Sequence, residues 1–149
     1  MTREELNTAT LRLFNISRDL FDKMAQKDSR ITNEEKNVLE GDFTSEPFNV
    51  HIKLSIYPEN GLMAIFSLLP FDVPPAKSSE MAKLICSINY NDLYAGNYDY
   101  NVEQGKVIFR LSMPFRNSIL SKELIEECIE YTVSTVSKYN NKMFETIRE

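Results

Sequence analysis

The strongest constraint on the fold is a pair of apolar segments joined by a short turn. Apolar and polar residues alternate from Val50 to Tyr57, which places every second side chain on one face of a half-buried β-strand. Pro58 to Gly61 follow, where proline fixes one backbone dihedral and Asn-Gly supplies the positive φ angles of a tight hairpin. Residues 62–69 are apolar on both faces. The sequence therefore predicts an antiparallel hairpin whose second strand is central in its sheet.

Helical and polar segments precede this hairpin. Apolar residues recur at three- and four-residue steps between Glu4 and Gln26, which predicts an amphipathic helix. Residues 27–37 are almost entirely polar, so we expect an exposed connection, helical in part. A short strand is predicted at 38–39.

Prolines end the first hairpin, because proline cannot donate a hydrogen bond to a sheet. A second helix is predicted beyond Pro75, and its apolar stripe is Met81, Leu84, Ile85 and Ile88. A second hairpin is expected from Gly96 to Met113, with its turn at 103–105.

The last predicted element is a long amphipathic helix. Ser121 has a hydroxyl that can cap the first turn, and apolar spacing continues nearly to the C-terminus. The predicted fold class is α+β, an antiparallel sheet flanked by helices in the order α-β-β-(β)-α-β-β-α.

Length and charge restrict the organisation and the partners. A chain of 149 residues suits one domain, 1–149, divided into an N-terminal helix at 1–26 and an α+β core at 36–149. The net charge of −5 comes without a basic stripe, so we expect no nucleic-acid partner. The most apolar window, 62–71, is too short for a membrane-spanning helix, and the first residues do not resemble a signal peptide. We therefore expect a cytoplasmic protein without membrane contact.

Few residues are candidates for chemistry. His51 is the chain's one histidine, and its parity places it on the polar side of its strand, so we interpret it as a solvated residue. Cys86 and Cys128 have no nearby metal-ligand partner, and we expect both to be core thiols. Four scattered glycines cannot form a phosphate-binding loop. We therefore expect no enzyme activity, cofactor or metal.

Acidic pairs occur at the start of the last predicted helix. Glu123 and Glu127 are four residues apart, as are Glu126 and Glu130. Such pairs could hold a cation or share a proton, but the helix dipole also stabilises acids in a first turn. We interpret them as a solvated acidic face.

The strongest indication of a binding site is a cluster of tyrosines. Tyr90, Tyr94, Tyr98 and Tyr100 lie close together in the sequence. Tyrosine combines a rigid apolar ring with a polar tip and is enriched at contact surfaces, but it is also ordinary in strands. The sequence leaves open whether these residues pack in the sheet or form an exposed protein-binding or dimer face.

Several short stretches resemble the YbjN-like family of small bacterial proteins, described as sensory transduction regulators. They are Asn89 to Leu93 (NYNDL), Gly96 to Tyr100 (GNYDY), Gly105 to Arg110 (GKVIFR), the segment Pro70 to Pro74, and a helix that opens at Ser121. In this reading Asn89 caps the end of a helix, and members of the family usually carry phenylalanine where Tyr98 stands.

The resemblance covers about residues 45–149 and implies a fold similar to type III secretion chaperones, which pair as homodimers and bind other proteins. It implies no catalytic residues. Our leading hypothesis is therefore a non-enzymatic interaction or regulatory module, homodimeric, with a protein partner. A narrower version is a secretion-chaperone-like protein that binds an unfolded effector segment by strand addition. The alternative of another class is a small-molecule sensor or an enzyme that uses carboxylates and tyrosines in a pocket between sheet and helices.

Overall fold

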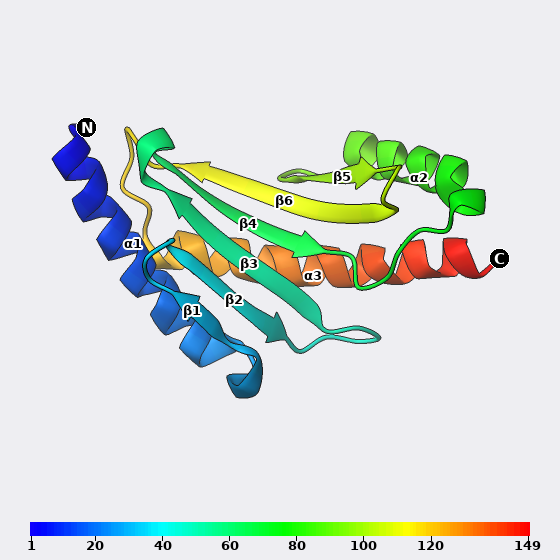
Figure 1. Ribbon diagram of the computed structural model, residues 1–149, viewed down its shortest axis with the longest axis horizontal. Coiled ribbons are helices and arrows are strands. Elements are labelled where there is room, and N and C mark those ends of the chain that lie inside the picture. Colours follow the sequence, from blue (N-terminus) through cyan, green and yellow to red (C-terminus); the bar gives the residue numbers. More distant parts are fainter.

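The computed structural model describes residues 1–149 and has one six-stranded antiparallel sheet with three long helices (Figure 1). The strand order across the sheet is β1-β2-β3-β4-β6-β5. The elements are α1 (Arg3–Met24), β1 (Ile31–Asn33), β2 (Val38–Phe43), β3 (Val50–Tyr57), β4 (Leu62–Leu68), α2 (Ser78–Asn91), β5 (Asn97–Asn101), β6 (Lys106–Pro114) and α3 (Lys122–Arg148).

The hairpin predicted from the alternating segment is confirmed. β3 pairs antiparallel with β4, and β4 pairs with β6 on its other side, so β4 is central. The turn differs from the expected Asn-Gly geometry. Pro58–Asn60 form a single 3-10 turn, and Gly61 alone takes a positive φ of 59°. Proline at the start of that turn fixes its first dihedral, so one left-handed residue is enough to reverse the chain.

The polar connection after α1 contains more structure than predicted. A 3-10 turn at Lys27–Ser29 leads into β1, and β2 continues to Phe43 rather than ending at Leu39. The sheet therefore has one strand more before α2 than the sequence indicated. β1 has three exposed residues and no apolar alternation, because its extended conformation comes from pairing with β2.

The segment from the second helix to the second hairpin follows the prediction. Met81, Ile85 and Ile88 of α2 are buried. β5 and β6 pair antiparallel around a turn that ends at Gly105, whose φ is 68°. A Cβ added to Gly105 would lie 2.6 Å from the carbonyl oxygen of Val73, so glycine is needed for both the dihedral and the close approach.

All three helices cover the same face of the sheet. The rings of Phe21 in α1 and Phe43 in β2 have centroids 5.3 Å apart. Tyr139 of α3 lies with its ring centroid 6.2 Å from that of Tyr98 in β5. α3 begins at its predicted cap, where Ser121 Oγ accepts a hydrogen bond from the Leu124 amide at 3.1 Å, and it crosses behind the sheet in Figure 1.

The core lies between this helical layer and the sheet. It contains 31 buried residues from helices and strands alike, including the expected inward residues of β3, Val50, Ile52, Leu54 and Ile56. α1 contributes Leu13 and Phe21, so the N-terminal helix packs on its own sheet. No helix is both long enough and apolar enough to cross a membrane.

Candidate functional site

The face of the sheet opposite the helices carries an uncovered group of apolar side chains. Leu62, Phe66 and Leu68 of β4 and Ile108 of β6 point to this side, because they alternate with the buried residues of their strands. Leu68 is 45% exposed, and Leu62, Phe66 and Ile108 are half-buried. We call this side of the sheet the open face. An uncovered apolar surface of this kind is typical of a contact surface.

The open face also carries charged residues, and most of them are paired within the chain. Arg110 donates to Asp99 at 2.6 Å. Lys53 of β3 is exposed, lies directly opposite Phe66 in the sheet register, and forms no ion pair. The centre of the open face therefore combines apolar side chains with one unpaired positive charge.

His51 lies on this side of the sheet, as its parity predicted, but it is not freely solvated. Its Nδ1 is 2.7 Å from Oδ1 of Asp42, and its Nε2 is 3.0 Å from Oε1 of Glu40. Burial lowers the pKa of His51, but hydrogen bonds and charge interactions with both carboxylates raise the pKa by more, so the net shift is upward. A protonated imidazole donates to both carboxylates, which joins β2 to β3 and does not suit a free general base.

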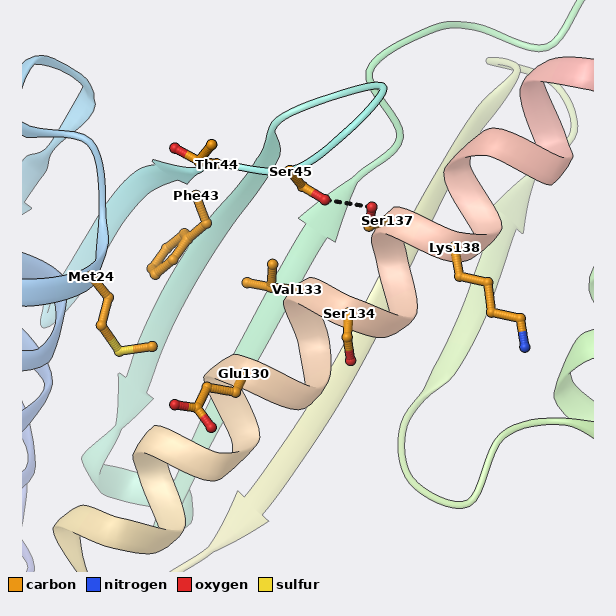
Figure 2. Close-up of a pocket in the computed structure, with 9 residues that line it drawn as sticks. All are labelled: Met24, Phe43, Thr44, Ser45, Glu130, Val133, Ser134, Ser137 and Lys138. Carbon is orange, nitrogen blue, oxygen red and sulfur yellow. Dashed lines mark hydrogen bonds between the residues drawn. The ribbon is translucent and has the colours of Figure 1, made fainter.

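A groove lies on the helical side of the molecule, between α3 and the ends of α1 and β2 (Figure 2). Its volume is about 630 Å³. The residues that line it come from three separate segments: Met24, Phe43, Thr44, Ser45, Glu130, Val133, Ser134, Ser137 and Lys138. We call it the α3 groove.

The α3 groove has an apolar floor and a polar rim. Met24, Phe43 and Val133 provide the apolar surface. On the rim, Ser45 Oγ is hydrogen-bonded to Ser137 Oγ, which in turn donates to the carbonyl oxygen of Glu46 at 3.1 Å (Figure 2). These bonds fix the loop after β2 against α3, so the rim is held in place by hydrogen bonds within the chain.

Both borders of the sheet are partly closed by groups that are not strands. At the β5 border, the Asn89 side chain donates to the Tyr98 carbonyl at 2.9 Å and accepts from the Tyr98 amide at 2.9 Å. On the other side β1 is the border strand and covers only residues 38–40 of β2. Beyond β1, Asp42 of β2 donates its amide to Ser29 Oγ at 2.8 Å, and its carbonyl accepts from the Gln26 amide at 2.8 Å. The predicted role of Asn89 as a helix cap was wrong, because its amide bonds to the strand instead.

The structure separates the four tyrosines that the sequence grouped together. Tyr90 at the end of α2 and Tyr94 in the following loop are 89% and 101% exposed. Tyr98 is 3% exposed and packs in the core, while Tyr100 is half-buried and its hydroxyl is inaccessible. Because alternate residues of β5 point to the helical side, Tyr98 and Tyr100 cannot share a surface with Tyr90 and Tyr94.

The two cysteines are not the core thiols that were expected. Cys86 is exposed on the outer side of α2, and Cys128 is half-buried on α3. Burial, followed by the charge of Glu127, raises the pKa of the Cys128 thiol. The prediction failed because it used the general burial of cysteine, although Cys86 falls outside the apolar stripe of its helix.

The acidic residues of α3 are spread around the start of the helix. Glu126 forms an ion pair with Lys23 of α1, with 3.2 Å between Oε1 and Nζ. Glu123, Glu127 and Glu130 are exposed and form no ion pair. No group of three or more His, Cys, Asp or Glu side chains is arranged to hold a metal ion. Glu130 instead lines the α3 groove, a position that the sequence did not indicate.

No family model and no curated protein matches the chain. Among solved structures, the chain is similar to one in the crystal structure of the ExsC–ExsE complex, with a TM-score of 0.57 and 13% sequence identity. The match covers 93% of this chain and 95% of that one. At this identity the likeness shows the fold alone. The chain has an α+β fold like that of the type III secretion chaperones, as expected, while the YbjN-like resemblance stays a prediction.

Proposed function

We propose that this chain is a non-enzymatic protein-binding module that acts as a homodimer and presents its open face and α3 groove to a protein partner. One observation carries the proposal: all three helices cover one face of the sheet, which leaves the partly exposed apolar residues of the opposite face without a covering helix. A regulatory role of the YbjN-like kind is part of the same proposal and is supported by the short motifs around Asn89 and Gly105.

The exposed tyrosines of the α2 region support a homodimer. Tyr90 and Tyr94 present two almost fully exposed aromatic rings, and Cys86 lies one helical turn before Tyr90. Aromatic rings are among the side chains most enriched at protein interfaces. Tyr98 supports the same region from inside, through packing against Tyr139 of α3 and Phe109 of β6.

Sedimentation velocity over a range of concentrations tests the homodimer. Wild type should sediment as a dimer, and the double variant Tyr90→Ser, Tyr94→Ser should weaken the dimer at least tenfold. Tyr57→Ser, at the end of β3, is the matched control and should leave the dimer unchanged. A wild-type monomer at every concentration would contradict this part of the proposal.

A secretion-chaperone-like role, in which the partner is an unfolded effector segment, is the narrower form of the proposal. Its support is the fold shared with a chain from the ExsC–ExsE complex. Strand addition is the weaker binding mode here, because Asn89 occupies the backbone groups of Tyr98 and β1 is only three residues long. Binding through side chains on the open face is the mode that we favour.

The test is co-expression with the product of each adjacent gene, followed by limited proteolysis of the isolated complex. A bound segment should become resistant to the protease, and Phe66→Ser should abolish that protection while leaving the chain folded. The control is Leu11→Ser, at an exposed apolar residue of α1 on the helical side of the sheet. Failure of every adjacent gene product to copurify or gain protection would count against the effector-binding role.

A further inference from the structure

We infer that the α3 groove binds an amphipathic helix of a partner protein, and that this helix runs antiparallel to α3. The inference rests on the proposed protein-binding function and specifies its partner. It follows from the shape of the groove, the groups available on its walls, and the positions of two unpaired charges.

The wall formed by α3 has the spacing of a helix-packing surface. Its lining residues lie at 130, 133, 134, 137 and 138, which follows the i, i+3, i+4, i+7, i+8 pattern of one helix face. Ser134 is small and exposed, so another helix could approach α3 closely at that point.

A helix satisfies its own backbone hydrogen bonds, and the groove offers few groups that could do so for an extended chain. Its floor is apolar, and the serines on its rim, Ser45 and Ser137, already bond to each other. An extended segment would leave the backbone amides and carbonyls that face this floor without hydrogen-bond partners, which is unfavourable. A helical occupant avoids that cost.

Two unpaired charges define a direction along the groove. Glu130 and Lys138 lie toward opposite ends of the stretch of α3 that lines it (Figure 2). Neither forms an ion pair. Eight residues of helix separate them by about 12 Å. Lys138 is exposed and points away from Met24 and Phe43 (Figure 2), with its ammonium 5.1 Å from the centre of the Tyr139 ring, so its flexible side chain turns toward the groove when it meets an acidic partner.

The complementary helix carries an acidic residue beside Lys138 and a basic residue beside Glu130. Acidic residues stabilise the N-terminal part of a helix and basic residues its C-terminal part, because of the helix dipole. The N-terminal part of the occupant therefore lies at Lys138 and its C-terminal part at Glu130, which is antiparallel to α3. The acidic and the basic residue of the partner helix should be about seven residues apart, so that both lie on the face that contacts α3.

The experiment is a selection from a displayed library of 18-residue helical peptides. The apolar stripe is fixed, and two positions seven residues apart are randomised among Asp, Glu, Lys, Arg and Ser. Wild type should enrich peptides with the acid first and the base second. The variant E130K/K138E should enrich the opposite order, with a change in peptide Kd of about threefold to tenfold when two exposed ion pairs are gained or lost.

The matched control is E127K/K142E, which exchanges the same types of charge on the same helix outside the groove. It should select the same peptides as wild type. Absence of enriched peptides on wild type, or the same order selected by wild type and E130K/K138E, would overturn the inference while leaving the tests of dimerisation and effector protection unaffected.

A second copy of this chain is the competing occupant, because an antiparallel α3 would also place Lys138 beside Glu130. If wild type self-associates, E130K alone disrupts that association and E130K/K138E restores it, the groove is a self-association site and the partner-helix inference is wrong.

Discussion

Asn89 makes with one side chain the two hydrogen bonds that a neighbouring strand would make to Tyr98. Its Nδ2 donates to the Tyr98 carbonyl and its Oδ1 accepts from the Tyr98 amide, both at 2.9 Å. The last turn of α2 thus takes the place of a seventh strand at the border of the sheet. This arrangement links the helix to the strand that carries the buried tyrosines.

Substitution of Asn89 by alanine should therefore expose the Tyr98 backbone at the sheet border. The expected loss in the free energy of unfolding is about 1–3 kcal/mol for two hydrogen bonds to partly buried groups. Hydrogen exchange measured by NMR should show faster exchange of the Tyr98 amide. Asn91→Ala is the control, because its side chain bonds only to Ser87 at 3.3 Å on the exposed side of the helix. Unchanged exchange at Tyr98 would contradict the assigned role of Asn89.

The His51 pair with Glu40 and Asp42 predicts a definite pH dependence. Since the folded-state pKa of His51 is raised, the folded chain binds the proton more tightly than the unfolded chain. The resulting stabilisation is present in full below the unfolded value of about 6.5 and is lost as the pH rises through the folded pKa. The advantage of wild type over His51→Gln in urea unfolding should therefore shrink with rising pH.

An NMR titration checks the same shift directly, because the chain has 1 histidine and its imidazole resonances need no assignment. The midpoint should lie above the ordinary value in wild type and fall in E40Q/D42N. A wild-type midpoint at or below about 6.5 would show that burial outweighs the two carboxylates.

Tyr98 carries a hydroxyl that the fold does not use. The hydroxyl is buried without a hydrogen-bond partner in the chain, and burial raises the pKa of Tyr98 above its ordinary range. Tyr98→Phe removes the unsatisfied group and keeps the ring, so we expect a gain of about 1–2 kcal/mol in the free energy of unfolding. Tyr98→Ala should instead lose about 3–5 kcal/mol through the cavity that it leaves. A clear loss of stability in the phenylalanine variant would contradict this account.

The two thiols should differ in reactivity. Cys86 is exposed, whereas Cys128 is half-buried and has a raised pKa, so Cys86 should react with a thiol reagent at neutral pH about tenfold faster or more. The reaction should therefore have a fast and a slow phase, and the single variants Cys86→Ser and Cys128→Ser show which thiol gives each phase. If the α2 region forms the dimer, the Cys86 rate should also fall as the protein concentration rises. Equal rates for both thiols would contradict the assignment of Cys128 as shielded.

The parts of the fold that the sequence predicted are those with a strong periodic pattern. The strand Val50–Tyr57, the stripe of α2 and the Ser121 cap all follow from spacing and from the chemistry of single residues. β1 could not be predicted in the same way, because its three exposed residues become a strand only through their pairing with β2.

Less of the candidate site could be predicted from the sequence. The α3 groove brings together Met24, Phe43 and Val133, which are far apart in the sequence, and no local pattern records their proximity. The one local signal was the spacing of Glu130, Ser134 and Lys138 along a single helix face. The tyrosine cluster failed for the opposite reason, because residues close in sequence are apart in the fold. Tyr90 and Tyr94 are exposed on α2 and the following loop, whereas Tyr98 and Tyr100 point from β5 to the helical side.

The hydrogen bonds that occupy the strand edges at Asp42 and Tyr98 affect the tendency of this chain to aggregate at high concentration. Growth into fibrils needs a long row of free amides and carbonyls onto which the next molecule can stack. Here β1, the border strand on one side, has only three residues, and the part of β2 beyond it bonds to Ser29 and Gln26. On the other side the row is interrupted by Asn89. The chain can therefore keep an apolar sheet face partly exposed and still resist edge-to-edge polymerisation of its sheet.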